Sequence, residues 1–216
     1  MTGVQTCALP ISRLLFGADR PDHGVIRLDG KPLKIKSPRD AIRQGICLLT
    51  EDRKTHGLVL GQSARENFGL PNLSQFAPLG FIRQREESLC FARYVDQIQI
   101  KITNPEQITG TLSGGNQQKI VLAKWLQRNA EVIIFDEPTR GIDVGAKYEI
   151  YQLINQLAAD GKAILMISSE LPEVLGMSDR ILVMNEGRIT GEITDVPNTT
   201  QEDIMKLAIS RQPLAA

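Results

Sequence analysis

The pattern of apolar and polar positions becomes regular only after the first dozen residues. Residues 14–17, Leu-Leu-Phe-Gly, are interpreted as the last turn of a buried helix that a glycine closes. Residues 24–31 alternate between apolar and polar side chains before a turn, which predicts a β-hairpin. A short helix is expected over residues 37–44, because Ser37 can cap its first turn and Pro38 suits its first position.

Short apolar runs alternate with helical patterns along much of the remaining chain. Strands are predicted at residues 46–49, 132–135, 163–168, 181–184 and 188–193. Helices are predicted at residues 120–128, 147–159 and 170–176. Continuous apolar strands separated by helices are typical of a parallel sheet that is covered on both faces, so the sequence predicts an α/β fold. Residues from about 63 to 104 have helical composition and no clear strand, which indicates an inserted helical subdomain.

Composition narrows the function classes. Among the 216 residues, Lys and Arg total 25 and Asp and Glu total 25, so an overall basic footprint for nucleic acid is absent, although a local basic patch is compatible with this balance. No apolar run approaches the roughly 20 residues that cross a bilayer, so we expect any membrane role to act through a partner. Cys7, Cys47 and Cys90 are scattered without zinc or redox spacing, which favours a cytosolic protein.

Ser113, Gly114 and Gly115 lie just before the helix predicted at residues 120–128. The glycines let a backbone approach a ligand closely, and a helix start offers unpaired N–H groups. Ser113 adds a hydroxyl donor, so the three residues could form a cradle for a terminal phosphate. On its own, such a turn is more often a simple helix cap, and the phosphate hypothesis needs support from elsewhere in the chain.

Two carboxylates, Asp136 and Glu137, follow the strand predicted at residues 132–135. Ligands bind at the carboxyl ends of the strands in open α/β sheets. Asp136 suits a Mg²⁺ site that is reached through water. Glu137 suits the orientation and deprotonation of an attacking water.

Three segments in this order resemble the ABC transporter ATPase family: LSGGNQQ at 112–118, FDEPTRGID at 135–143 and DRILVMNEG at 179–187. The likeness runs from about residue 13 to residue 210. It implies a P-loop NTPase-like ABC ATPase domain with a mostly parallel sheet, an inserted helical subdomain and an antiparallel β part. Within the family, the chain resembles the C-terminal half of duplicated ATPases that serve ribose, xylose and similar sugars. This resemblance rests on Glu-Asp-Arg at 51–53, Asn-Gln-Gln at 116–118 and Pro-Thr-Arg-Gly-Ile-Asp at 138–143.

The resemblance implies ATP and Mg²⁺ as cofactors and assigns roles to individual residues. Glu137 would be catalytic, Asp136 would lie at the metal, and Asp143 would belong to the loop that communicates across the ATPase interface. The signature residues that would bind nucleotide are Leu112, Ser113, Gly114, Gly115, Asn116 and Gln117.

The phosphate-binding motif G-x-x-x-x-G-K-[ST] occurs nowhere in the chain. In this family it lies just before the point where the regular pattern begins, and residues 3–12 resemble a translated sequencing adapter. We therefore expect 1–12 to be a non-native leader in place of the Walker A strand and loop; a genuine edge strand or loop ending at Pro10 is the alternative. Residues 13–216 would be the ABC domain, with a core lobe at 13–62 and 130–216 and a helical subdomain at about 63–129.

Two further positions depart from the family. Glu51 stands where a glutamine normally contacts Mg²⁺ and the membrane subunit, and Ser169 stands where a switch histidine is expected. Both resemble the C-terminal halves of the duplicated ATPases and are interpreted as native. ABC domains pair head to tail, so this chain is expected to donate its signature to ATP held by the N-terminal ATPase half, or by a second ATPase domain. Alone it is expected to be inactive.

The leading hypothesis is the energy-coupling component of an ABC importer for carbohydrates. Nucleoside import, a non-transport ABC ATPase and a non-catalytic interaction module remain alternatives. The expected partners include transmembrane permease subunits, but neither nucleic acid nor direct contact with the transported sugar. The chain would be cytoplasmic and peripheral to the inner membrane, coupled through the region from Glu51 into the helical subdomain, although a solvated loop there is the alternative.

Overall fold

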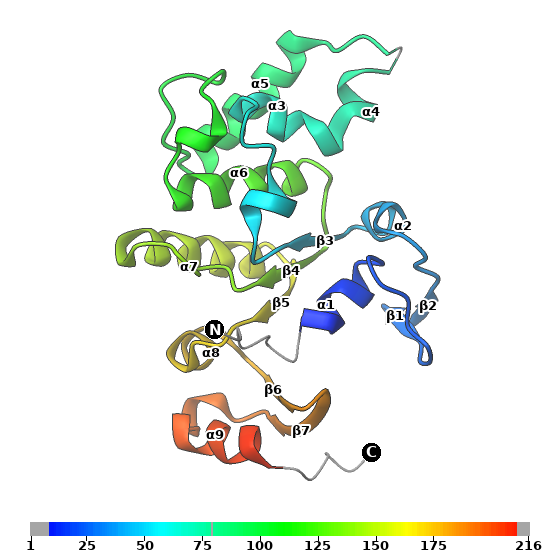
Figure 1. Cartoon of the computed structure of the whole chain (residues 1–216), viewed down its shortest axis with the longest axis vertical. Coiled ribbons are helices and arrows are strands. Elements are labelled where there is room, and N and C mark those ends of the chain that lie inside the picture. Colours follow the sequence, from blue (N-terminus) through cyan, green and yellow to red (C-terminus); the bar gives the residue numbers. More distant parts are fainter. Residues whose placement is uncertain (1–8, 79, 211–216) are drawn as a thin grey trace. The chain divides into compact units, whose positions relative to one another are not determined.

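Short strands and helices alternate along the described chain, which comprises residues 9–78 and 80–210 of the computed structural model (Figure 1). The chain divides into two compact units. One contains the chain up to Ala41 and from Met166 onward, and the other contains residues Ile42–Leu165. Most of the expected leader, residues 1–8, lies outside the described residues.

The central sheet is built from the predicted apolar strands. Its strands are β3 (Ile46–Leu49), β4 (Val132–Asp136) and β5 (Ala163–Ile167), in the order β3-β4-β5. β3 and β4 run parallel, and all side chains of β3 are buried. β4 is buried from Ile133 to its last residue, so its apolar run forms the interior that the sequence predicted.

Helices occupy most of the chain between β3 and β4. They are α3 (Ala64–Gly69), α4 (Leu73–Phe76), α5 (Gln84–Gln97) and α6 (Gly114–Leu126), with 3₁₀ turns at Leu70–Asn72 and Thr109–Thr111 and a π-helical turn at Arg53–Gly57. In Figure 1, α3, α4 and α5 gather together. The fully buried ring of Phe68 packs on the ring of Phe91, with centroids 5.2 Å apart. The helical composition of residues 63–104 is thereby confirmed.

Two helices begin earlier than the apolar pattern predicted. α6 begins at Gly114 rather than near residue 120, and α7 (Val144–Ala159) begins three residues before the predicted start at 147. The reason lies in capping. The side chains of Ser113 and Asp143 accept hydrogen bonds from the first turns of α6 and α7, which extends each helix beyond its apolar stripe.

The other unit combines short helices with two antiparallel ribbons. Its elements are α1 (Leu9–Leu15), β1 (Ile26–Leu28), β2 (Lys31–Leu33), α2 (Pro38–Arg43), α8 (Leu171–Met177), β6 (Ile181–Asn185), β7 (Arg188–Ile193), a 3₁₀ turn at Val196–Asn198 and α9 (Gln201–Ile209). α2 crosses the boundary at Ala41. The hairpin predicted over residues 24–31 is confirmed as β1 and β2.

The apolar run of β6 resembles those of β3 and β4. It pairs antiparallel with β7, because Glu186 and Gly187 adopt positive φ angles of 47° and 77° and close a tight turn. Ile181 and Val183 of β6 join Val196 and Ile204 in a small core of their own. The helix α9 was not predicted.

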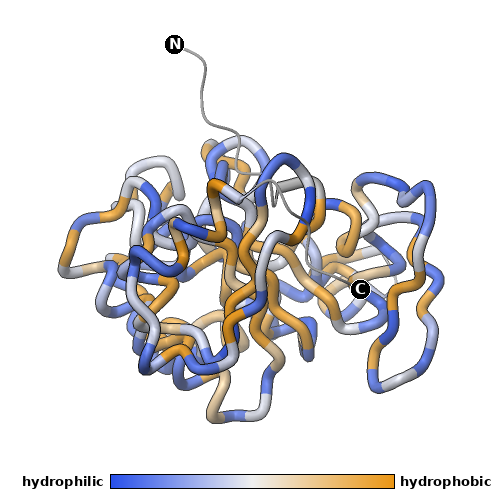
Figure 2. The backbone as a smooth tube through the Cα atoms, turned by 90° about the horizontal axis from the view of Figure 1, so that it is seen from below, coloured by the Kyte–Doolittle hydropathy of each residue, from blue (hydrophilic) through white to orange (hydrophobic). Residues whose placement is uncertain are grey.

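Hydropathy changes repeatedly along the backbone trace, as Figure 2 shows by the alternation of orange and blue segments. The longest described helix, α7, has 16 residues and carries polar side chains on its exposed face. Within residues 9–78 and 80–210, a helix with the length and apolar character of a bilayer span is absent.

Gly17 closes α1 as the sequence predicted, although Leu14 and Leu15 are only half-buried. Its N–H donates to the carbonyl of Leu14 at 3.1 Å, and Ala18 N–H donates to the carbonyl of Arg13 at 2.9 Å. With a φ angle of 74° at Gly17, this is a Schellman cap. A Cβ at Gly17 would also lie 2.7 Å from the carbonyl oxygen of Ser37, so the cap packs directly on the chain that leads into α2.

Gly17→Ala is expected to destabilise the protein in two ways. The positive φ angle costs an L-residue about 1–2 kcal/mol, and the clash with the Ser37 backbone adds about 1–3 kcal/mol. Gly30→Ala is the matched control, because Gly30 has a φ angle of 75° and a Cβ there would meet no atom within 4 Å. Denaturant unfolding should show the larger loss for Gly17→Ala, and equal losses would contradict the packing role.

Candidate functional site

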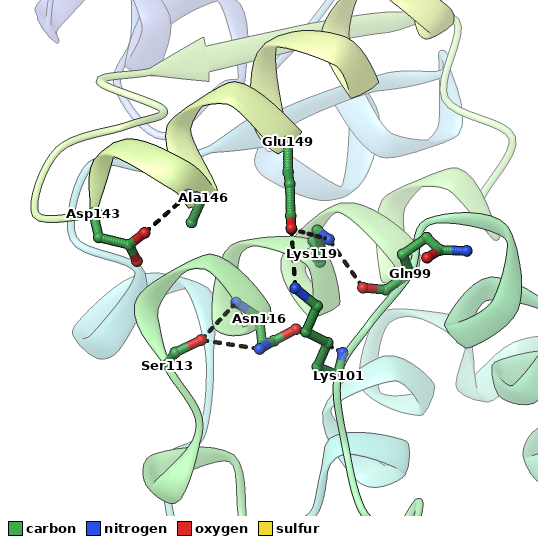
Figure 3. Close-up of polar contacts among 8 residues, drawn as sticks. All are labelled: Gln99, Lys101, Ser113, Asn116, Lys119, Asp143, Ala146 and Glu149. Carbon is green, nitrogen blue, oxygen red and sulfur yellow. Dashed lines mark hydrogen bonds and ion pairs between the residues drawn. The ribbon is translucent and has the colours of Figure 1, made fainter.

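Ser113 places a hydroxyl at the exposed start of α6 (Figure 3). Its Oγ accepts hydrogen bonds from the backbone N–H of Asn116 at 3.5 Å and from Nδ2 of Asn116 at 2.9 Å. The first N–H groups of an α-helix lack partners within the helix and form the positive end of its dipole. The start of α6 thus offers the donors that an anion requires.

Gly114 and Gly115 have little room for a side chain. A Cβ at Gly114 would lie 2.6 Å from Nη2 of Arg53 and 3.4 Å from the carbonyl oxygen of Gly141. A Cβ at Gly115 would lie 2.9 Å from Cβ of Ala146, in the first turn of α7. The two glycines therefore permit close packing of separate segments, a role that the sequence did not suggest.

Two other signature residues face the interior. Leu112 is buried, and the buried Gln117 side chain donates from Nε2 to the carbonyls of Thr109 at 3.1 Å and Leu112 at 3.2 Å. These bonds hold the turn that precedes Ser113. Contact of Leu112 or Gln117 with nucleotide stays a prediction.

The segment that contains Glu51 and Arg53 contacts the loop after β4. Glu51 forms an ion pair with Arg140, and Nη1 of the buried Arg53 donates to the carbonyl of Arg140 at 3.1 Å. Arg53 thus lies between this loop and Gly114 of the signature. The sequence analysis assigned a role to Glu51 but none to Arg53 or Arg140. Their contacts could not be predicted, because only the fold brings residues 53, 114 and 140 together.

Asp136 and Glu137 lie at the carboxyl end of β4 and are both buried. Glu137 has a φ angle of 48°, which is uncommon for a residue with a side chain and is concentrated at functional sites. A buried carboxylate at this position fits a Mg²⁺ that is reached through water. Among the residues that the structure describes, a cluster of three or more His, Cys, Asp or Glu side chains that could hold a metal ion is absent.

Asp143 caps α7 beside the start of α6. Its Oδ1 accepts a hydrogen bond from the N–H of Ala146 at 3.0 Å (Figure 3). The same Ala146 packs against Gly115, so the loop that carries Asp143 is fixed next to the signature. The structure therefore brings Asp143 and the signature together, as their assignment to one interface requires.

Glu149 ties α7 to α6 and to the loop before the signature. Its carboxylate accepts hydrogen bonds from Nζ of Lys119 at 2.7 Å and from Nζ of Lys101 at 3.0 Å (Figure 3). Hydrogen bonds from these ammonium groups, Lys119 first, lower the pKa of Glu149. Lys119 also donates to the carbonyl of Gln99 at 2.9 Å. No local signal in the sequence marks this arrangement, because its members come from three separate segments.

Lys124 anchors α6 to the π-helical turn that carries Arg53. Its Nζ donates to the carbonyl of Gly57, within a buried region. Burial lowers the pKa of Lys124 to about 8 and raises the pKa of the neighbouring Cys47 thiol to about 12. This buried amine was also missed in the sequence.

Ser169, the residue at the switch-histidine position, belongs to the other compact unit. It is exposed in the segment that joins β5 to α8. Its predicted role therefore stays a prediction, and the arrangement around Ser113 and Asp143 does not bear on it.

Comparison with solved structures identifies the fold class of this chain. The fold resembles solved ATP-binding cassettes: the ADP conformation of MJ1267, an ATP-binding cassette of an ABC transporter, matches with a TM-score of 0.74 at 20% identity, over 94% of this chain and 83% of that chain. A dimeric post-hydrolysis state of the cassette MJ0796, bound to ADP and Pi, matches with a TM-score of 0.70 at 20% identity, over 85% of this chain and 78% of that one. The predicted fold class is confirmed.

The family model for ABC transporters matches residues 11–140, more than half of the chain. The chain belongs to the ABC transporter family. Its curated relatives include the ribose import ATP-binding protein RbsA of Oceanobacillus iheyensis, 54% identical over 92% of this chain and 40% of that protein. RbsA of Bacillus subtilis is 53% identical over 91% of this chain and 40% of that protein. The chain thus spans about 40% of the length of these relatives.

The buried amine of Lys124 should make stability depend on pH. Between its folded pKa of about 8 and the ordinary value of 10.5, the unfolded chain binds more protons than the folded chain, so the free energy of unfolding rises with pH. From pH 8 to pH 9 the gain should be about 1 kcal/mol. Above the ordinary thiol pKa of 9.0, Cys47 acts in the opposite direction, because its folded thiol keeps a proton that the unfolded thiol loses.

Denaturant unfolding of the wild type, Lys124→Met and Cys47→Ala at pH 7, 8, 9 and 10 tests this dependence. The free energy of unfolding of Lys124→Met should change less from pH 8 to pH 9 than that of the wild type, whatever the stability of the variant at pH 7. For Cys47→Ala, the free energy of unfolding should still rise from pH 8 to pH 9 and should continue to rise above pH 9. Identical pH profiles for the wild type and Lys124→Met would show that Lys124 is not responsible.

Proposed function

We propose that this chain is the signature-donating ATP-binding domain of a carbohydrate importer. The observation that carries the proposal is the exposed hydroxyl of Ser113 at the start of α6, beside Asp143, which caps the neighbouring helix α7. The chain would complete an ATP site whose phosphate-binding loop belongs to a second ATPase domain.

An exposed apolar stripe supports pairing at this face. Val144 is 85% exposed and Tyr148 is 63% exposed, one turn apart on α7. Residues four apart share one face of a helix, so both side chains lie on one face of α7, the helix that Asp143 caps. A tyrosine and a valine left in solvent beside the signature are suited to burial against a second domain. The dimeric MJ0796 cassette named above offers a precedent of the same fold.

The chain's own nucleotide site would be weak. Asp136 and Glu137 remain at the end of β4, and their predicted metal and catalytic roles belong to that site. A phosphate-binding loop supplies a lysine and backbone N–H groups, each charge-assisted bond contributing about 1.5–3 kcal/mol. Without those bonds the isolated chain should bind ATP weakly and hydrolyse it slowly. In the assembled protein, hydrolysis would take place at the ATP that the partner domain holds.

The solute and the location are inferred from the relatives. Both RbsA proteins are ribose import ATP-binding proteins, and this chain shares more than half of its aligned residues with each. We therefore assign it to the import of ribose or a related sugar, at the cytoplasmic face of the membrane. The transported sugar would contact the permease and not this chain.

A surface between α4 and α5 is suited to the permease. A hollow of about 510 Å³ lies there, lined by Gln75, Phe76, Glu86, Leu89, Cys90 and Arg93. Leu89 is 62% exposed, and Phe81 in the preceding loop is 85% exposed. Exposed apolar side chains around a hollow with charged margins are typical of a protein-binding surface.

The pairing role is tested by Ser113→Arg. A cassette of the same family with an intact phosphate-binding loop, whose catalytic glutamate is replaced by glutamine, is mixed with this chain. Sedimentation should show association only with ATP and Mg²⁺, and Ser113→Arg should abolish it because the larger cation fills the phosphate cradle. Gln97→Arg, at the exposed end of α5, should associate like the wild type. An unchanged affinity for Ser113→Arg would refute the proposal.

The permease role is tested separately by Leu89→Glu. Burying a carboxylate in an apolar interface is costly, so co-purification with a detergent-solubilised sugar-importer permease should fall about tenfold or more. Ile209→Glu, another exposed apolar residue on α9, should leave it unchanged. ATP-dependent pairing of the two ATPase domains should survive Leu89→Glu. Equal co-purification of both variants would assign the permease surface elsewhere.

A further inference from the structure

We infer that Asn116 is a positioning residue that turns the Ser113 hydroxyl proton outward, toward a bound phosphate oxygen. The inference rests on the proposed function, since it concerns how the donated signature meets ATP. Asn116 itself need not contact the nucleotide.

The first step concerns the Ser113 oxygen. A serine hydroxyl has two acceptor lone pairs and one proton to donate. Two N–H groups of Asn116, from its backbone and its side chain, point at this oxygen at 3.5 and 2.9 Å. Both donors lie on the helix side of the hydroxyl. The hydroxyl proton is repelled from that side and is directed to an acceptor in front of the exposed serine.

The second step concerns the orientation of the Asn116 amide. Its Oδ1 accepts a hydrogen bond from the backbone N–H of Lys101 at 2.7 Å. A reversed amide would place its NH₂ group against that N–H and its oxygen against Ser113. The Lys101 N–H therefore fixes the Asn116 amide so that its NH₂ group points toward Ser113. Figure 3 shows this orientation of Asn116 and Ser113.

The third step concerns what holds Lys101. Its Nζ binds Glu149 at 3.0 Å, and Lys119 binds both Glu149 at 2.7 Å and the carbonyl of Gln99 at 2.9 Å. The loop at residues 99–101 is thereby attached to α6 and α7. Since α7 begins just after Asp143, the orientation of the Ser113 hydroxyl depends on contacts that extend to the proposed interface.

Asparagine is suited to this task by its chemistry. An aspartate at this position would keep the shape but would accept the Ser113 proton, turning it inward, and would add negative charge near a phosphate. A leucine would keep the volume and remove the side-chain donor without adding charge. The two substitutions therefore separate proton direction from bulk.

The experiment measures ATP-dependent association of this chain with the ATP-loaded cassette described above. Asn116→Asp should weaken association about 10- to 100-fold, and Asn116→Leu about 3- to 10-fold. Asn129→Asp, an exposed residue just beyond the other end of α6, is the matched control and should change affinity less than about twofold. Denaturant unfolding of each variant checks that α6 remains folded.

A double-mutant cycle separates positioning from a general structural effect. If Asn116 acts through the Ser113 hydroxyl, adding Asn116→Leu to Ser113→Ala should weaken association no further. Additive losses, or an Asn116→Asp affinity equal to that of Asn129→Asp, would overturn the inference while the wild-type association upholds the proposed function. A wild-type chain that fails to associate with the ATP-loaded cassette would overturn both.

Discussion

Close packing at the start of α6 is the constraint on which the surrounding structure depends. Gly114 and Gly115 leave space that Arg53 and Ala146 fill, so the π-helical turn and α7 approach the same two residues. Arg53 also binds the carbonyl of Arg140, which brings in the loop after β4. Any side chain at these glycines would separate segments that together present Ser113 and Asp143.

Buried charges then fix how those segments fit. Lys119 binds Glu149, Lys124 binds the carbonyl of Gly57, and Arg65 binds Glu87 in the helical region. Removing charge from water is costly, and an unpaired buried charge is more costly still, so each buried cation favours arrangements that keep its partner. The main effect of these contacts is to define the geometry of the segments, and their net contribution to the free energy of unfolding is smaller. The signature turn is thereby held by directional bonds on several sides.

The sequence predicted what local physical chemistry determines. The apolar strands at residues 46–49 and 132–135, the hairpin at 24–31 and the glycine that closes α1 were all identified, since each depends on neighbouring residues. The early starts of α6 and α7 were missed because an apolar stripe marks where a helix is buried, and capping marks where it begins. The helix α9 begins with a Thr-x-x-Asp capping box, a local signal in the sequence that would have predicted this helix. The contacts of Arg53, Lys101 and Glu149 could not be predicted from the sequence, because they join residues that are far apart in the chain.

The contacts that hold the signature turn lie within one compact unit of the chain. Ser113, Asn116, Lys101, Glu149 and Asp143 all belong to the unit Ile42–Leu165. Their hydrogen bonds and ion pairs come from side chains and backbone groups of this unit alone, and they hold the signature turn on several sides. A domain that grips phosphate must supply a loop and lysine of its own, whereas a domain that completes another's site needs only a rigid donor surface. The unit Ile42–Leu165 presents such a surface through its own side chains, and the proposed donation of the signature rests on it.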